Sequence, residues 1–304
     1  MNDRTDRIEI SRLAIPSFLV VMTVFSAIRL LGIDPWAMPA YDAFAYWVTR
    51  SGIDYSATHQ GITGAFLYSP LFAQLIAPLT ALPWTVFLAI WTFLLALPLV
   101  WLAGRYALPL LVLPPVFMSV ALGQLDLAFA GVAILGLRYP VLWALPLLTK
   151  ITPGIGLLWF LVRGEWRSLG IALGATASVA AVSAVAAPEA WGGWIALLAR
   201  MDFPELGGGL WFLPLPLGFR LFVAAALIAW GAAGDRRWVI PVGVCLSLPT
   251  VWLNSPTILI ALLPLVAAGA RTPAAAWLRR SVPRVEIEAP QRRLERWFRR
   301  VTTS

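Results

Sequence analysis

Long apolar segments alternate with short polar ones along almost the whole chain. Several of them approach the length of about 20 residues that a membrane-spanning helix requires, and Pro or Gly interrupts nearly all. Within a bilayer, such interruptions persist only where neighbouring helices or a water-lined cavity satisfy the freed backbone groups. The pattern predicts an all-α, polytopic transmembrane bundle of about ten crossings with an internal cavity. The apolar segments cover approximately residues 13–31, 66–82, 84–103, 107–122, 124–137, 140–162, 169–187, 211–233, 238–253 and 256–270.

Composition supports a membrane protein. The sequence is 60% hydrophobic and 12% charged, whereas soluble domains carry about 25% charged residues. Its 16 Trp suit the boundaries between membrane and water. The single Cys245 excludes an internal disulfide, and no Cys or His pattern indicates a zinc site. The sequence predicts no definite cofactor, and a divalent metal remains an open question.

The arginines predict the orientation. Arginines precede the first apolar segment and flank two short loops, and the positive-inside rule places all of these in the cytoplasm. The charged start, Met1–Ser11, has no small-residue cleavage site, so we expect the first apolar segment to remain as an anchor. The sequence thus predicts a multi-pass protein of the plasma or inner membrane with both termini cytoplasmic. The predicted outer segments are Ile33–Ala65, Pro188–Leu210 and the turn Asn254–Ser255.

The segment 66–82 allows two topologies. If it spans the membrane, Arg105 and Arg138 lie outside. If it lies in the interface or re-enters, both arginines become cytoplasmic, and segment 140–162 splits into two short helices near Lys150. We favour the second arrangement, because it obeys the positive-inside rule and spares Lys150 a position deep in hydrocarbon.

The net charge of +8 comes largely from the C-terminal tail and does not indicate nucleic-acid binding. We predict a single transmembrane domain over 1–270 and a basic cytoplasmic tail over 271–304. Arginines around Trp297 and Phe298 are typical of a helix on anionic lipid, and a disordered tail is the alternative.

The first outer loop is long for a connector, and long ordered loops usually carry function. Ala40–Arg50 predicts a short amphipathic helix on which Asp42 and Tyr46 share one face. Phe44 and Trp47 would face the lipid surface. Asp42 is therefore a candidate catalytic carboxylate, although an ordinary solvated loop acid is an equal alternative.

Other polar residues of the outer segments are weaker candidates. Asp34 precedes a proline and indicates a turn. Asp54 is a candidate acid or a solvated one, and His59 could orient a sugar hydroxyl or a phosphate, although a lone loop His is more often incidental. Tyr68 could point into a cavity or anchor the interface. Arg200, in a segment predicted to form an interfacial helix, could assist an anionic head group; contact with bulk lipid is the simpler interpretation.

Two polar sites interrupt apolar sequence at membrane depth. Gln124 and Asp126 are costly there unless they face water or partners, so both are candidate site residues, Gln124 as a contact of the donor or its phosphate. The structural alternatives are an inter-helix hydrogen bond for Gln124 and a helix cap for Asp126. Lys150, the only lysine, requires an anion, either a carboxylate such as Asp126 or a lipid phosphate. We favour phosphate binding by Lys150.

Several short motifs follow one another along the chain: Tyr41-Asp42, Tyr46-Trp47, Phe66-Leu67-Tyr68-Ser69-Pro70-Leu71-Phe72, Pro78-Leu79, Gly123-Gln124, Lys150-Ile151-Thr152-Pro153 and Arg163-Gly164-Glu165-Trp166-Arg167. In this order and spacing they resemble the GT-C glycosyltransferases of family 87 over roughly residues 34–170. In the late region Trp252-Leu253-Asn254-Ser255-Pro256, Asn254 stands where the family more often has His.

The resemblance implies a GT-C-like fold and an inverting transfer of a sugar, mannose above all, from a polyprenyl-phosphate donor at the outer face. The acceptor would be a lipid-linked molecule or a glycan. The resemblance maps the catalytic base onto Asp42 and a carrier-phosphate contact onto Lys150. A transporter or lipid flippase is the alternative, but it predicts acids spread along mid-membrane helices, whereas here they cluster in outer loops.

Overall fold

The computed structural model describes residues 40–58, 62–201, 215–266 and 272–281, and within these ranges every regular element is helical. The predicted all-α class is therefore confirmed for this part of the chain. The longer helices are α3 (Pro70–Thr80), α4 (Trp84–Ala103), α7 (Asp126–Leu135), α10 (Trp166–Ala186), α11 (Pro188–Arg200) and α12 (Leu217–Ala233). The shorter ones are α2 (Tyr41–Trp47), α5 (Ala107–Leu111), α6 (Pro114–Leu122), α8 (Ala144–Thr149), α9 (Leu158–Arg163), α13 (Val239–Leu246), α14 (Leu262–Val266) and α15 (Pro273–Ser281).

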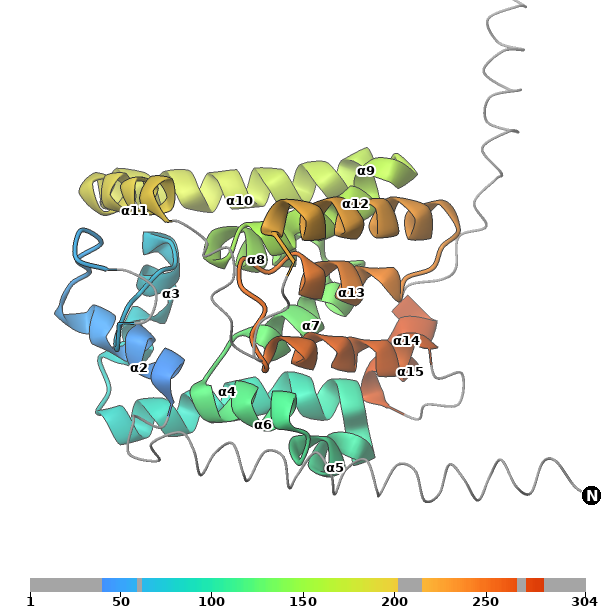
Figure 1. Cartoon of the computed structure of the whole chain (residues 1–304), viewed down its shortest axis with the longest axis horizontal. Coiled ribbons are helices and arrows are strands. Elements are labelled where there is room, and N and C mark those ends of the chain that lie inside the picture. Colours follow the sequence, from blue (N-terminus) through green and yellow to red (C-terminus); the bar gives the residue numbers. More distant parts are fainter. Residues whose placement is uncertain (1–39, 59–61, 202–214, 267–271, 282–304) are drawn as a thin grey trace, which may run out of the picture.

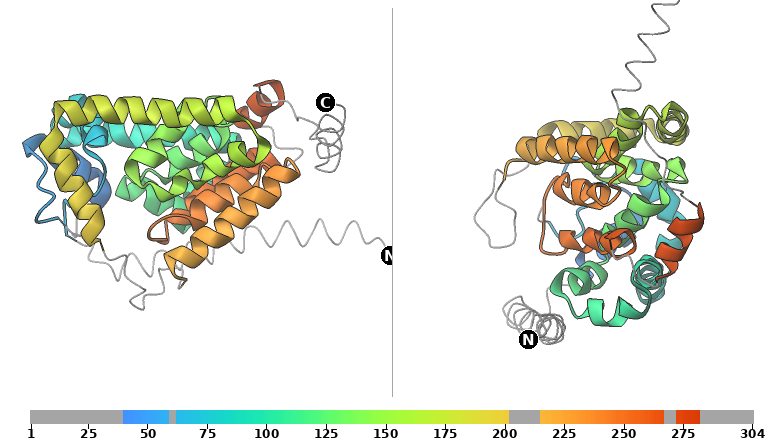
Figure 2. Two further views of the ribbon diagram at one scale, coloured as in Figure 1. Left: turned by 90° about the horizontal axis from the view of Figure 1, so that it is seen from above. Right: turned by 90° about the vertical axis from the view of Figure 1, so that its right-hand side faces the viewer.

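The helices form an elongated bundle with two different ends. Helices α4 and α10 run along the long axis and α12 crosses it obliquely, whereas α2, α3 and α11 gather at one end (Figures 1 and 2). Helix α3 therefore lies beside the helix of the first outer loop and does not run the length of the bundle. This placement agrees with the topology in which segment 66–82 does not cross the membrane.

The expected ten full crossings are not confirmed. Among the described residues, two helical segments, Trp84–Leu111 and Trp166–Ala186, are long and apolar enough to cross a membrane. The consecutive helices α6 and α7 would make a third span, but a bend of 106° separates them. The remaining apolar helices are shorter, because breaks divide the apolar segments that the hydrophobic pattern shows as continuous.

Two of these breaks lie where polar residues interrupt the apolar sequence. Segment 140–162 divides at Lys150 into Pro140–Thr149 and Thr152–Arg163, as the favoured topology requires. The two halves pack closely, because Gly156 lies against the Trp143 ring where any side chain would collide. The other break separates α6 from α7 at residues 123–125.

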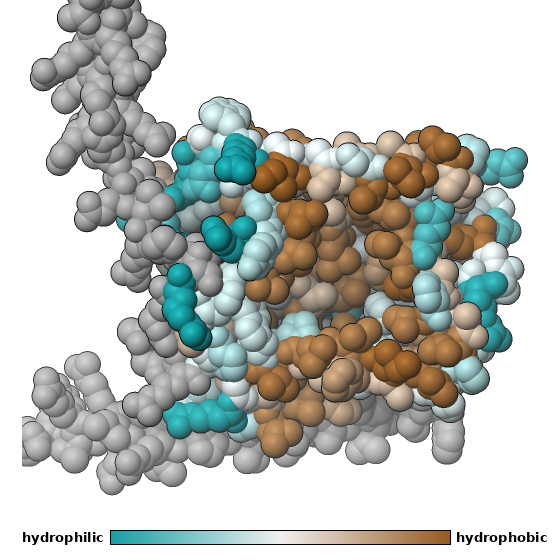
Figure 3. All heavy atoms as spheres, turned by 180° about the vertical axis from the view of Figure 1, so that it is seen from behind, coloured by the Kyte–Doolittle hydropathy of each residue, from teal (hydrophilic) through white to brown (hydrophobic). Residues whose placement is uncertain are grey.

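On the face shown in Figure 3, apolar side chains form the middle, and the strongly hydrophilic ones gather toward the two ends. The end opposite α2 and α11 holds the segments after α4 and α7 and the connections from α9 to α10 and from α12 to α13 (Figure 1). We call it the arginine end, because these segments carry Arg105, Arg138, Arg163, Arg167, Arg236 and Arg237. Ion pairs join its loops, from Arg163 to Glu165 and Asp235 and from Arg237 to Asp235.

The first outer loop folds as predicted. Helix α2 and the 3-10 turn Val48–Ser51 cover the expected segment. The rings of Phe44 and Trp47 pack against Trp84 at centroid distances of 5.7 and 5.5 Å, so they cover the start of α4. Both side chains keep part of their surface exposed, and their contact with lipid stays a prediction.

The boundary predicted between domain and tail remains a prediction, because most of 271–304 lies outside the described residues. Its first helix, α15, contacts the bundle through Trp277, whose ring lies 5.9 Å from that of Trp101 and 6.1 Å from that of Tyr139. The first predicted helix, 13–31, also lies outside the described residues.

Candidate active site

The site lies where three breaks between helices meet the helix of the first outer loop. These breaks separate α6 from α7, α8 from the 3-10 helix Thr152–Leu157, and α13 from the 3-10 helix Ser255–Ala261. Helix α2 approaches the first of them so closely that a Cβ on Gly123 would lie 2.5 Å from Ala43 Cβ. Gly123 also has φ of 80°, in the left-handed region. The glycine thus permits both the sharp bend and the approach of Asp42 to Gln124.

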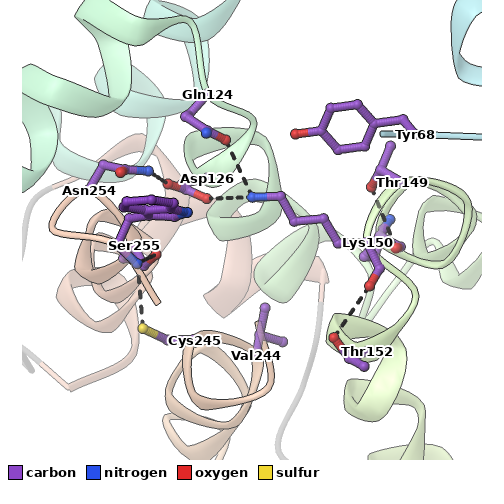
Figure 4. A network of polar contacts seen from close by, with 12 residues as sticks. Tyr68, Gln124, Asp126, Thr149, Lys150, Thr152, Val244, Cys245, Asn254 and Ser255 are labelled. Atoms are coloured by element: carbon purple, nitrogen blue, oxygen red, sulfur yellow. Dashed lines mark hydrogen bonds and ion pairs between the residues drawn. The ribbon is translucent and has the colours of Figure 1, made fainter. Parts of the chain in front are cut away.

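Lys150 occupies the centre of this polar cluster. Its side chain extends from the break after α8 toward the N-terminus of α7, where Nζ donates to Gln124 Oε1 at 3.3 Å and lies 3.6 Å from Asp126 Oδ1 (Figure 4). The ammonium also lies 5.6 Å from the centre of the Phe129 ring. Of the two anions that the sequence analysis offered Lys150, the structure contains the carboxylate of Asp126.

The backbone that presents Lys150 is strained. Ile151 adopts φ 56° and ψ −64°, and the Thr152 amide donates to the Lys150 carbonyl at 2.6 Å. This is the rarer form of γ-turn, which is unfavourable for a β-branched residue. Such strain persists only where the surrounding packing determines it, and it concentrates at functional sites.

Asp42 faces the same cluster from α2. Its side chain keeps some exposure, yet protein surrounds it on most sides, and this burial raises the pKa of the carboxyl to about 7. The positive charge of Lys150 and hydrogen bonding with Gln124 act in the opposite direction, and the charge of Asp126 adds to the rise. A carboxyl with a pKa near neutrality is suited to accept a proton during a reaction.

Two tyrosines, Tyr46 and Tyr68, line the polar cluster beside Lys150. Tyr46, from α2, is fully buried, and its hydroxyl donates to the Tyr68 hydroxyl at 3.1 Å. The Tyr68 hydroxyl is directed toward the region between Gln124 and Lys150 (Figure 4). Because Tyr68 accepts from Tyr46, its own proton is free to be donated toward the centre of the cluster.

Asn254 belongs to the cluster and was not among the predicted site residues. Its amide nitrogen donates to Asp126 Oδ2, and both side chains are buried. In the sequence, Asn254 stands out only as a departure from a motif, because its partner lies far away in the chain. A polar residue in the short turn between two apolar segments, 238–253 and 256–270, was the one signal that could have found it. The cap predicted as the alternative role of Asp126 is absent, since its side chain caps no helix.

Two other candidates lie away from the cluster. Asp54 is exposed and accepts hydrogen bonds from the Ser56 amide and hydroxyl, so it stabilises a turn. Arg200 donates to the carbonyls of Tyr55 and Thr58, which fastens the end of α11 to the first outer loop. His59 and Asp34 lie outside the described residues.

A metal site has no obvious ligand set within the described ranges, where no group of three His, Cys, Asp or Glu residues comes together. The cluster combines one carboxyl able to accept a proton with hydrogen-bond donors and a cation able to hold an anion. It is therefore suited to activate a hydroxyl beside a phosphate group.

Comparison with known proteins finds one matching family. The family model of glycosyltransferase family 87 matches residues 66–208, which confirms the resemblance predicted from the sequence. No curated protein and no solved structure gives a significant match. The matched region contains Tyr68, Gln124, Asp126 and Lys150, and the structure adds Asp42 and Asn254 from either side of it.

Proposed function

We propose that this chain is a glycosyltransferase of family 87, which its match over residues 66–208 supports, and that it transfers mannose from a polyprenyl-phosphate donor to a lipid-linked or glycan acceptor. The observation that carries the proposal is the meeting of Asp42 and Lys150 in one polar cluster, although they come from elements far apart in the sequence. A base and an anion-binding cation are the two groups that this transfer requires.

The reaction proceeds with inversion. The acceptor hydroxyl gives its proton to Asp42 while its oxygen forms a bond to the anomeric carbon, from the side opposite the phosphate. The bond between that carbon and the phosphate oxygen breaks, and its electron pair leaves with the polyprenyl phosphate. Lys150 and the Tyr68 hydroxyl stabilise the charge that develops there, with Gln124 beside them. One carboxylate suffices, because the phosphate is already a good leaving group.

The site opens toward the outer face of the membrane. Helix α2, which carries Asp42, lies at the end opposite the arginine end (Figure 1), and arginine-rich loops are typically cytoplasmic. With this orientation, we propose that both termini lie in the cytoplasm. The family match supports a transferase and gives no support to a transporter or flippase.

Transfer of radiolabelled mannose by purified protein tests the proposal directly. We expect transfer from a polyprenyl-phosphate mannose donor and a product of inverted anomeric configuration, which NMR of the product determines. Retention of configuration would contradict the single-base mechanism, and a wild-type protein that uses no polyprenyl-phosphate sugar would contradict the proposed donor.

The role of Lys150 has its own test. Lys150→Met should raise the donor KM about 10-fold or more, since a hydrogen bond to a charged group contributes about 1.5–3 kcal/mol. Lys150→Arg should rescue only partly, because a planar fork replaces a point charge. Arg138→Met, which removes an exposed cation at the arginine end, is the matched control. A folded Lys150→Met protein with an unchanged donor KM would assign Lys150 a structural role.

A further inference from the structure

The two carboxylate oxygens of Asp126 have different surroundings. Oδ2 accepts the amide proton of Asn254 at hydrogen-bond distance, whereas Oδ1 has no hydrogen-bond partner in the described structure and lies 3.6 Å from Lys150 Nζ. A direct charge-assisted bond would bring the two atoms to about 2.7–2.9 Å. The ammonium is therefore near its carboxylate but not closed onto it.

Asn254 can only be the hydrogen-bond donor in its contact with Asp126. A carboxylate oxygen only accepts hydrogen bonds, so the asparagine must present its amide nitrogen to Asp126. Both side chains are more than nine-tenths buried, and a buried hydrogen bond to a charged group is strong. The bond thus fixes the rotation of the Asp126 carboxylate and, through it, the position of Oδ1.

The segment that carries Asn254 is itself anchored. Buried Arg220 of α12 donates to the carbonyls of Leu246, Leu248 and Pro249, which end α13 and begin this segment. The Trp252 amide donates to the Ser255 hydroxyl at 2.9 Å and closes the following turn. Asn254 therefore approaches Asp126 from a rigid support.

From this arrangement we propose that Asn254 is a positioning residue for the donor phosphate, acting through Asp126 on Lys150. Asn254 holds Asp126 where it keeps Lys150 charged and directed into the cluster without enclosing its ammonium, which stays available to a phosphate. The inference rests on the proposed function for the identity of the phosphate, but the geometry of Lys150 can be tested without any donor.

The kinetic test compares two buried substitutions on neighbouring positions. Asn254→Leu releases Asp126 to close on Lys150 and should raise the donor KM about 10-fold or more, with a smaller effect on kcat. Thr257→Val is the matched control, because Thr257 is equally buried, lies in the 3-10 helix that Asn254 precedes as the N-cap residue, and its hydroxyl has no hydrogen-bond partner in the described structure. In a Lys150→Met background, Asn254→Leu should raise KM no further. Equal effects in both backgrounds would overturn the proposal.

A double substitution separates positioning from support of the fold. Asn254→Asp with Asp126→Asn keeps one amide, one carboxylate and their hydrogen bond, but moves the negative charge away from Lys150. A purely structural pair would be rescued by this exchange and would restore the wild-type KM. We expect the raised KM to persist, and its full restoration would contradict the inference.

The single lysine supplies a readout that needs no donor. Selective ¹³C labelling of lysine gives one side-chain NMR signal, that of Lys150. Asn254→Leu and the exchanged pair should shift this signal, and Thr257→Val should not. An unmoved signal in Asn254→Leu would overturn the proposal even if the wild type transfers mannose. A shifted signal in a protein without transfer would leave the geometry supported and the proposed donor wrong.

Discussion

Two carboxylates of the first outer loop, Asp42 and Asp54, have opposite surroundings. Asp54 is exposed, and hydrogen bonds from Ser56 hold the pKa of its carboxyl below the usual range. Asp42 is enclosed, and burial raises its pKa to about 7. The same residue type is therefore suited to remain an anion in one place and, as we propose for Asp42, to accept a proton in the other.

The pH dependence of transfer follows from the Asp42 pKa. The base is active only when deprotonated, so kcat/KM should rise as the pH increases through about 7 and level off above it. Measurement of initial transfer rates between pH 5 and 9 checks this prediction. A carboxyl with the typical pKa near 4 is deprotonated throughout this range, so only a raised pKa produces a change in rate there. A rate that is already constant above about pH 5 would indicate a base with an ordinary carboxyl pKa.

The residues of the site could be predicted only in part. Asp42, Tyr46, Tyr68, Gln124 and Lys150 were candidates because a polar side chain in apolar or aromatic sequence needs a reason. Asn254 escaped because an amide gives little local signal and its partner is distant in the chain. Asp54 was a reasonable candidate that the structure places in a turn, since sequence does not distinguish an enclosed loop acid from a solvated one.

At the scale of elements, uninterrupted apolar segments were predicted most accurately. The segment 84–103 coincides with α4. The segment 107–122 instead divides into α5 and α6, because Pro114 begins a new helix. Hydrophobicity alone cannot show such divisions, since both halves remain apolar. The packing of three helix breaks around the Lys150 ammonium brings together distant parts of the chain, so the hydrophobic pattern could not predict it.

The bend between α6 and α7 offers a test of how elements position the base. Gly123→Ala should displace α2, because the added Cβ meets Ala43 and the left-handed conformation costs about 1–2 kcal/mol. We expect lower thermal stability and a loss of transfer activity. Gly174→Ala on α10 is the control, since its Cβ would meet open space, and helix propensity favours Ala. Wild-type activity in Gly123→Ala would show that the close approach of α2 is not required.

At the scale of the whole molecule, the proposed orientation places the arginine end in the cytoplasm and the opposite end, which holds α2, α3 and α11, outside. Thr58 lies in the first outer loop, and Arg138 follows α7 near Trp277 of α15, as the contact of the adjacent Tyr139 shows. In intact cells, an impermeant thiol reagent should label Thr58→Cys and reach Arg138→Cys only after permeabilisation. The buried Cys245 leaves little background. Labelling of both positions in intact cells would contradict this orientation and favour the other topology, in which segment 66–82 crosses the membrane and Arg138 lies outside.

The central claim is that Asp42 is the base of a glycosyl transfer driven by a polyprenyl-phosphate donor. Asp42→Asn keeps the shape of the side chain and removes its basicity, while Asp54→Asn makes the same change on an exposed turn. General-base catalysis typically contributes about 100- to 10,000-fold in rate.

The most direct measurement is therefore the initial rate of radiolabelled mannose transfer at saturating donor, for wild type, Asp42→Asn and Asp54→Asn at equal amounts of folded protein. We predict a loss of at least about 100-fold in the rate of Asp42→Asn, with donor affinity retained and Asp54→Asn close to wild type. Robust transfer by Asp42→Asn would contradict the role of Asp42 as the base.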